Sequence, residues 1–246
     1  MISKVKSCAL YGINGYLVDV EVDLSEGLPG FDLVGLPDSS IREAKERVRA
    51  AIKNSEFLFP IKRITVNLAP ADTKKEGSAF DLPIAIGIIS CNEPISEDIL
   101  NKTMMIGELS LDGSIRPVNG ILPMVYSALQ NGITECIVPF ENAEEGAIVE
   151  GMEVIGVRTL REAIKHLQRE QIVSKTTVDI QSVMNHPISS QQDFSDVKGQ
   201  IHVKRALEIS AAGSHNVLMI GPPGSGKTMM ARRLPTILPD LSFEES

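Results

Sequence analysis

Apolar residues occupy every second position in several segments of the first two thirds of the chain, which is the pattern of half-buried strands. The segments predicted to be strands are residues 5–10, 17–24, 64–68, 135–138 and 154–157. The dipeptide Asp112-Gly113 separates two further apolar segments, residues 104–111 and 114–118, and predicts a β-hairpin with a two-residue turn. Strands are therefore expected throughout this region.

Between these strands, apolar residues recur at the three- and four-residue spacing of helices. A helix is predicted to open at residues 38–40, where Ser40 and Glu43 have the spacing of a capping box. Its apolar face consists of Ile41, Ala44, Val48, Ala51 and Ile52. The charged residues of its other faces, which are expected to face solvent, are Arg42, Lys45, Glu46, Arg47 and Arg49.

Three further helices are predicted in the same region. Residues 81–89 form an apolar stretch with Pro83 in the first turn, where proline is tolerated, and this stretch is too short to span a bilayer. Another helix is expected near residues 122–130. A last helix, capped by Thr159 and Glu162, runs to about residue 168. The alternation of strands and helices predicts a mixed α/β fold.

The composition changes after residue 168. Residues 169–194 are rich in Ser, Gln, Thr and Asn and are predicted to form a linker, interrupted by His186-Pro187. The elements predicted beyond it are a helix over 201–213, a buried strand over 216–221 and a helix from 227 that stops near Pro235. The predicted organisation is therefore a domain over 1–168, a linker, and the N-terminal part of a second domain over 195–246.

Composition and charge narrow the class of protein. With 43% hydrophobic and 23% charged residues, the chain has the composition of a soluble globular protein. It has no apolar run of the ~20 residues that a membrane span needs and no signal-peptide pattern, so a cytoplasmic location is expected. Residues 195–246 hold six Lys/Arg and five Asp/Glu, which leaves 18 and 27 before them. This acidic excess, with 4% aromatic residues, argues against a nucleic-acid surface on the N-terminal region.

The cysteines and histidines do not indicate a site. Cys8, Cys91 and Cys136 are far apart in the sequence and lie among apolar residues, so they are expected to be buried free thiols. The four histidines are isolated from one another and lack the spacing of metal ligands; they are His166, His186, His202 and His215.

One contiguous motif carries clear chemistry. The residues Gly221, Pro222, Pro223, Gly224, Ser225, Gly226, Lys227 and Thr228 match the phosphate-binding pattern G-x-x-x-x-G-K-[ST]. The glycines let backbone N–H groups turn toward a phosphate, and the N-terminus of the following helix adds positive potential. Lys227 would contact the β- and γ-phosphates, and Thr228 would ligate Mg²⁺ through its hydroxyl. The sequence therefore predicts a site for ATP and Mg²⁺ between a strand and a helix.

The motif lies only 18 residues before Ser246. An ATPase also needs an acidic residue at a strand end to hold Mg²⁺ and position water, and often an arginine from a neighbouring subunit. No second hydrophobic strand ending in Asp or Glu follows the motif. This segment is therefore expected to bind nucleotide weakly, and to take part in ATP hydrolysis only within a longer protein.

Six stretches of the chain have a distinctive sequence in a fixed order. They are FDLVGLPD (31–38), ERVRAAI (46–52), NLAPAD (67–72), GSAFDLP (77–83), GELSLDG (107–113) and residues 215–239. Together they resemble the N-terminal half of the ComM/YifB family, the magnesium chelatase-like AAA+ proteins, and the resemblance covers essentially the whole chain.

The resemblance implies an α+β Lon-protease-like domain followed by the start of a P-loop AAA+ α/β domain. It also implies a homohexameric ring that remodels DNA, with roles in competence and in branch migration during recombination. In AAA+ proteins the segment that corresponds to residues 197–200 lies near the adenine of ATP. Any pore loops that contact DNA would lie beyond Ser246.

The resemblance to Lon raises the question of a peptidase, in which a lysine activates a serine nucleophile. The turn that holds Lon's serine corresponds to GSAFD in this chain, where Ala79 takes the place of the serine and one gap would move Ser78 there. Leu122 holds the place of Lon's lysine and cannot accept a proton. Lys74 and Lys75 precede the loop and would serve only after a rearrangement. Peptidase activity is therefore not expected, and Ser78 is interpreted as a helix cap.

Three functions stay open. The first is an ATP-driven ring motor that acts on DNA, with the N-terminal domain as an assembly or docking element. The second is a chelatase-type or chaperone-like AAA+ protein that acts on protein or cofactor partners. The third is a Lon-like peptidase with Ser78 as the nucleophile. Magnesium chelatase itself fits the P-loop region, but the Lon-like domain is expected to fall outside that subunit's pattern. No membrane partner is expected.

Overall fold

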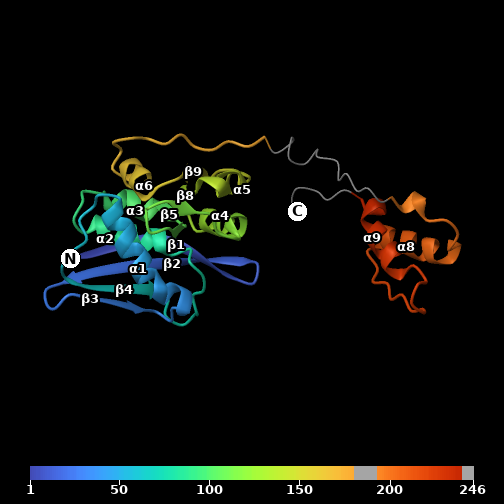
Figure 1. Cartoon of the computed structure of the whole chain (residues 1–246). Coiled ribbons are helices and arrows are strands. Elements are labelled where there is room, and N and C mark those ends of the chain that lie inside the picture. The colour runs from blue at the N-terminus through green and yellow to red at the C-terminus, as the bar shows by residue number, and fades with distance from the viewer. Residues whose placement is uncertain (180–192, 240–246) are drawn as a thin grey trace. The chain divides into compact units, whose positions relative to one another are not determined.

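The computed structural model describes residues 1–179 and 193–239. The chain divides into two compact units, Met1–Val178 and Asp179–Ser246 (Figure 1). The first unit is built around one large sheet, and the described part of the second consists of short helices and irregular segments. No helix in the described ranges is both long and apolar enough to cross a bilayer.

The sheet of the first unit has seven strands in the order β3-β4-β2-β1-β5-β8-β9. They are β1 (Ile2–Tyr11), β2 (Asn14–Ser25), β3 (Gly30–Val34), β4 (Arg63–Ala69), β5 (Thr103–Met105), β8 (Glu135–Pro139) and β9 (Glu153–Val157). Strand β2 is antiparallel to both β1 and β4, and the other four pairings are parallel. All five segments predicted as strands are confirmed, and so is the mixed α/β fold.

Two parts of the sheet depart from the prediction. Strand β3 was not predicted, because five residues at a sheet edge with few core-facing positions give a weak alternating signal. Residues 104–111, predicted as one arm of a hairpin, are divided between two strands. Their first residues belong to β5 in the main sheet, and only β6 (Glu108–Leu109) pairs with β7 (Ile115–Arg116) across the predicted turn.

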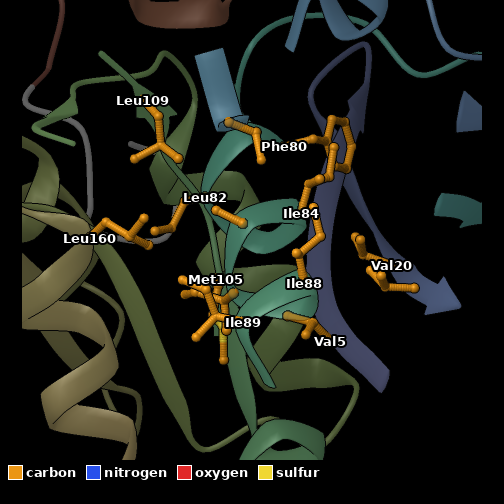
Figure 2. Close-up of a cluster of buried hydrophobic side chains, with 14 of the residues drawn as sticks. Val5, Val20, Phe80, Leu82, Ile84, Ile88, Ile89, Met105, Leu109 and Leu160 are labelled. Carbon is orange, nitrogen blue, oxygen red and sulfur yellow. The ribbon is translucent and has the colours of Figure 1, made fainter. Parts of the chain in front are cut away.

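Helices cover both faces of this sheet. They are α1 (Ser39–Asn54), α2 (Asp81–Ser90), α3 (Glu97–Lys102), α4 (Ile121–Gln130), the 3-10 turn η1 (Phe140–Asn142), α5 (Ala143–Ala147) and α6 (Leu160–Leu167). Successive residues of a strand point to opposite faces. Ile137 of β8 accordingly packs in the core under α1, α2 and α6, whereas Cys136 and Val138 pack in the core under α4 and α5. Figure 2 shows the first core, where Val5 and Val20 of the β1–β2 hairpin lie against α2.

The structure tests the predicted helix caps. Asp38 caps α1, since its carboxylate accepts a hydrogen bond from the Ile41 N–H at 2.9 Å. The predicted capping box at Ser40 is therefore wrong, because Ser40 already lies within the helix. Thr159 does cap α6, since its hydroxyl accepts from the Glu162 N–H at 3.2 Å. The five predicted apolar residues of α1 are all buried, and the three cysteines are buried free thiols, as expected.

The chain beyond α6 stays with the first unit for several residues. The Thr176 N–H donates to the Val154 carbonyl of β9 at 2.8 Å, and Val173 packs against the core. The unit therefore extends past residue 168, where the predicted first domain ends. Residues 180–192 of the predicted linker lie outside the described residues, and its last residue, Phe194, begins a 3-10 turn of the second unit.

A buried polar cluster ties this segment to the sheet. His166 of α6 is 1% exposed, and its Nδ1 accepts a hydrogen bond from the Val173 N–H at 3.0 Å. Its Nε2 lies 3.5 Å from the carboxylate of Glu135, which also accepts from the Thr103 hydroxyl at 2.9 Å and lies 3.5 Å from the guanidinium of Arg169. Burial by itself raises the pKa of Glu135, but these partners hold that pKa below its ordinary value.

Glu135→Gln is expected to make the stability of the chain less sensitive to acid. Because folding lowers the pKa of Glu135, its interactions stabilise the fold fully above its ordinary pKa of 4.5 and are lost as the pH falls through the folded-state pKa. Urea titrations at about pH 6 and about pH 3 should therefore show a larger loss of unfolding free energy in the wild-type chain than in the variant. An equal loss in both proteins would contradict this account.

The second unit holds four short elements in its described part. They are the 3-10 turn η2 (Phe194–Asp196), α8 (Ile201–Gly213), α9 (Lys227–Arg233) and the 3-10 turn η3 (Leu234–Ile237). A small core of Phe194, Val197, Leu207 and Met230 joins them. The helices predicted over 201–213 and from 227 are confirmed, and α9 ends at Arg233, near Pro235, as expected.

The buried strand predicted over residues 216–221 is wrong. These residues are irregular, and Leu218 and Ile220 are 84% and 88% exposed. A strand is stable only when its backbone groups pair with a neighbouring strand, and the described residues of this unit contain none. The apolar run alone was therefore not enough to form a strand.

Candidate nucleotide site

The predicted phosphate loop joins the irregular segment before it to the N-terminus of α9. Gly224 and Gly226 have φ angles of 80° and 85°, in the left-handed region that favours glycine. Gly226 is the N-cap residue of α9, whose first residue is Lys227. A Cβ atom added at Gly221 would lie 3.0 Å from the Ser225 hydroxyl oxygen. The loop is therefore a tight turn that ends at a helix N-terminus.

The side chain of Lys227 folds back onto this loop. Its Nζ donates to the carbonyl oxygens of Gly221 and Pro222 at 2.7 and 2.8 Å and lies 3.3 Å from Ser225 Oγ. These contacts hold one positive charge between the first and later residues of the loop. An ammonium group in this place attracts an anion such as a phosphate.

A pocket of about 410 Å³ lies beside the loop. Its walls are the loop, the apolar residues 217–220 and α8. Gln200, the last residue of the segment expected near the adenine, lines this pocket. Val197, the first residue of that segment, is 3% exposed and packs in the small core instead. The pocket combines a polar loop with apolar walls, which suits a ligand that has both phosphates and a ring.

The residues present fit a nucleoside triphosphate with Mg²⁺. The first N–H groups of a helix have no acceptor within it, and those of α9 would hold phosphate oxygens together with Lys227. Thr228 is exposed on the first turn of α9, where its hydroxyl would ligate Mg²⁺. The metal ion supplies charge neutralisation, while the chain would supply position and the charge of the lysine. These roles stay predictions.

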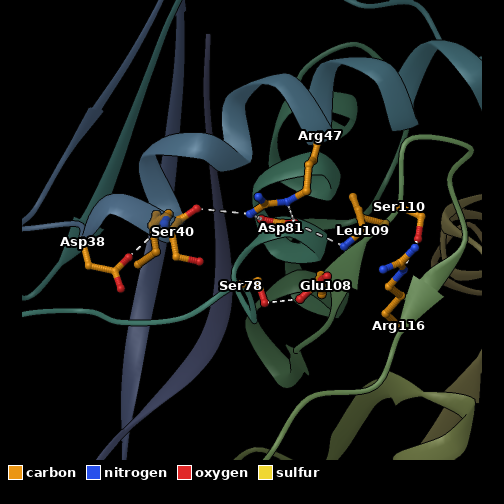
Figure 3. A network of polar contacts seen from close by, with 10 residues as sticks. Asp38, Ser40, Arg47, Ser78, Asp81, Glu108, Leu109, Ser110 and Arg116 are labelled. Atoms are coloured by element: carbon orange, nitrogen blue, oxygen red, sulfur yellow. Dashed lines mark hydrogen bonds and ion pairs between the residues drawn. The ribbon is translucent and has the colours of Figure 1, made fainter.

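Ser78, the candidate nucleophile, belongs to a polar network in the first unit (Figure 3). Its hydroxyl donates a hydrogen bond to the carboxylate of Glu108. Helix α2 begins at Asp81 with Phe80 as its N-cap, and Ser78 contributes only its carbonyl, which accepts from the Asp81 N–H at 3.2 Å. The interpretation of Ser78 as a side-chain helix cap is therefore wrong.

A serine–lysine pair is not assembled in the described part of the chain. Lys74 pairs with Glu76 at 2.7 Å on the surface. Lys75 is fully buried, and its ammonium donates to the carbonyl of Pro70 rather than to a serine. Leu122, at the place of Lon's lysine, packs with other apolar side chains against the second core. The geometry therefore lacks the base that a Lon-like peptidase requires.

The same network contains an ion pair that local sequence patterns do not show. Asp81 is fully buried and accepts hydrogen bonds from Arg47 at 2.6 and 3.1 Å and from the Leu109 N–H at 3.2 Å (Figure 3). Burial raises the pKa of Asp81, which Arg47 opposes, and the carboxylate raises the pKa of Arg47. The expectation that Arg47 faces solvent is therefore wrong. The sequence contains a single indication of this ion pair, which is that both residues lie in distinctive stretches, ERVRAAI and GSAFDLP.

Two family models match the chain. One, described as subunit ChlI of Mg-chelatase, covers residues 20–142, and the other, described as magnesium chelatase, subunit ChlI, covers residues 193–246. The N-terminal region thus matches a family model that is named after the ChlI subunit of magnesium chelatase. The expectation that this region would not resemble that subunit is therefore wrong.

Curated relatives point the same way. The chain is 44% identical over 243 residues to the competence protein ComM of Haemophilus influenzae, which covers 98% of this chain and 48% of that protein. It is 41% identical over 247 residues to the uncharacterized protein YifB of Escherichia coli, covering 100% of this chain and 47% of that protein. It is 28% identical over 187 residues to Lon protease 2 of Bacillus subtilis, covering 66% of this chain and 32% of that protein.

The chain therefore spans about half the length of the ComM and YifB proteins that it matches. The order of a sheet-based unit followed by a P-loop unit, the two family models and the identity over nearly the whole chain agree. The chain belongs to the ComM/YifB family of magnesium chelatase-like AAA+ proteins.

Proposed function

We propose that this chain is the N-terminal part of an ATP-driven motor that remodels DNA in the cytoplasm as a homohexamer. The loop at residues 221–228 carries the proposal. It combines glycines with positive φ angles, a lysine whose ammonium folds back onto the loop, and a helix N-terminus, all beside a pocket of about 410 Å³. The name of the Haemophilus influenzae relative, a competence protein, supports a role in processing incoming DNA.

The DNA contacts are proposed to lie outside this chain. The residues before Ser195 carry 27 acidic and 18 basic side chains, an excess of negative charge that repels the phosphate backbone. The first unit is therefore better suited to binding protein, either within the ring or in a partner. The P-loop unit would transmit ATP binding and hydrolysis to the parts that grip DNA.

Branched DNA is expected to stimulate ATP hydrolysis by the full-length protein more than equal concentrations of duplex or single-stranded DNA. The reason is that a motor couples hydrolysis to the substrate on which it does work, so the preferred DNA structure raises turnover. Phosphate release measured with each DNA at fixed salt tests this, since salt weakens all phosphate contacts.

A second candidate, a chelatase-type protein that acts on protein or cofactor partners, is favoured by the descriptions of the two family models. The same assay separates the two. Hydrolysis that no DNA stimulates, but that a porphyrin or a protein client does, would reject the DNA motor and support this alternative.

A further inference from the structure

Strand β1 is paired along one edge only for much of its length. It pairs with β2 from Ile2 to Tyr11, but on its other side it meets β5 at a single position, Lys6 with Met104. Beyond β5 the chain bonds elsewhere, since the Gly107 N–H donates to the Ala79 carbonyl at 3.0 Å rather than to β1. The last residues of β1 therefore have no strand beside this edge among the described residues.

The hydrogen-bond pattern shows which backbone groups line the open edge. Met1 and Leu24 exchange both backbone bonds, at 2.9 and 3.0 Å, so odd-numbered residues of β1 face β2. Even-numbered residues face the other side, as Lys6 does where it meets β5. The N–H and C=O groups of Cys8 and Leu10 therefore point toward the open edge.

A pocket of about 370 Å³ lies against this edge, and we call it the β1-edge pocket. Residues 8–10 form one wall, and the turn at 77–80 together with residues 117–119 forms the others. Leu10, Phe80 and Met124 give the pocket an apolar lining. A strand rises about 3.3 Å per residue, so the open edge accommodates four or five residues of extended chain.

The polar side chains of the pocket are acidic. Glu108 and Glu76 line it, and no Lys, Arg or His is among the described residues that do so. Glu108 holds the Ser78 hydroxyl, and Glu76 shares its charge with Lys74 in an exposed pair, which is a weak interaction. Arg116 stands opposite Glu108 in the β6–β7 pairing but donates to the Ser110 hydroxyl and does not line the pocket. The charged side chains among the described lining residues are therefore all acidic, and they favour a cationic side chain in the pocket.

We propose that the β1-edge pocket binds an extended, basic peptide segment of a partner protein. The segment adds a strand to the open edge of β1 and is released without being cleaved. The main chain of the peptide would pair with Cys8 and Leu10, and a lysine or arginine would reach Glu108. Cleavage is not expected, because neither Lys74 nor Lys75 meets Ser78 to act as the Lon-type base, and burial raises the pKa of the Cys8 thiol to about 12. The proposal does not depend on the nucleotide site.

The test uses the 246-residue chain and three short peptides. The first is acetyl-Val-Lys-Val-Lys-Val-amide, the second has glutamate in place of both lysines, and the third is the lysine peptide N-methylated at alternate residues. The lysine peptide is expected to bind, to protect the Leu10 amide from hydrogen exchange, and to be recovered intact. The N-methylated peptide should not bind, because it has lost the donors that pair with β1.

Glu108→Gln keeps a partner for Ser78 but removes the charge, so it should weaken binding of the lysine peptide by about threefold to tenfold. Glu150→Gln, which changes an exposed glutamate outside the pocket, is the matched control and should leave binding unchanged. Three results would overturn the proposal: no binding up to about 1 mM peptide, equal binding of the three peptides, or cleavage of the lysine peptide. The proposal would also be overturned if, without any peptide, protection of the Leu10 amide from hydrogen exchange increased with the concentration of the chain. That result would show that a second copy of the chain occupies the edge.

Discussion

Lys227→Ala is expected to reduce ATP hydrolysis by the full-length protein at least about 100-fold, the loss typical of removing one preorganised charge or donor from a reaction centre. Lys227 places its ammonium 2.7 and 2.8 Å from the carbonyls of Gly221 and Pro222. No other Lys or Arg lies within the loop at residues 221–228. Its removal would leave the loop to hold the phosphates through backbone N–H groups and the Mg²⁺ that Thr228 would ligate, without a positively charged side chain of its own. Steady-state phosphate release is the measurement.

The fold should survive this change, because the side-chain contacts of Lys227 lie within its own loop and it is not part of the small core. Lys102→Ala is the matched control, since it removes an exposed lysine whose ammonium pairs with Asp98 on the surface of the first unit, and it should leave hydrolysis unchanged. Wild-type turnover in a folded Lys227→Ala variant would mean that the phosphate site has been assigned to the wrong residues.

Asp81→Ala is expected to destabilise the first unit by about 3–5 kcal/mol, the cost of removing one partner of a buried ion pair. Asp81 is fully buried, and Arg47, whose side chain is 23% exposed, would lose a partner that it contacts through two nitrogen atoms. The N–H of Leu109 would also lose its acceptor. Urea denaturation followed by circular dichroism measures the change in unfolding free energy.

Asp32→Ala provides the comparison, because Asp32 also pairs with an arginine but on the surface. The side chains of Asp32 and Arg63 are 51% and 60% exposed, so this pair should contribute less than about 1 kcal/mol. If the two alanine variants lost equal stability, burial would not be what makes the Arg47–Asp81 pair important.

The elements with a local signal could be predicted from the sequence. Strands β1 and β2 and helix α1 follow from hydrophobic period, because each has enough residues to show one face buried. Helix α2, which is buried on all sides, follows instead from an apolar run with proline in its first turn. The phosphate loop was found because its chemistry is contained in eight consecutive residues.

Features that depend on distant residues could not be predicted in this way. Arg47 and Asp81 are 34 positions apart, and helical period alone assigned Arg47 to solvent. The strand expected over 216–221 shows the opposite error, in which an apolar run lacked the neighbouring strand that it needs. The β1-edge pocket combines residues 8–10, 76–80 and 117–119, so only the fold reveals it.

The most direct test of the central claim is to map where Mg²⁺–ATP binds on the 246-residue chain by backbone amide NMR, at millimolar nucleotide because weak binding is expected. The account predicts amide shifts concentrated at Gly221, at residues 224–228 and at Gln200, and their loss in Lys227→Ala. Shifts that are absent, that persist unchanged in Lys227→Ala, or that fall in the first unit would contradict it.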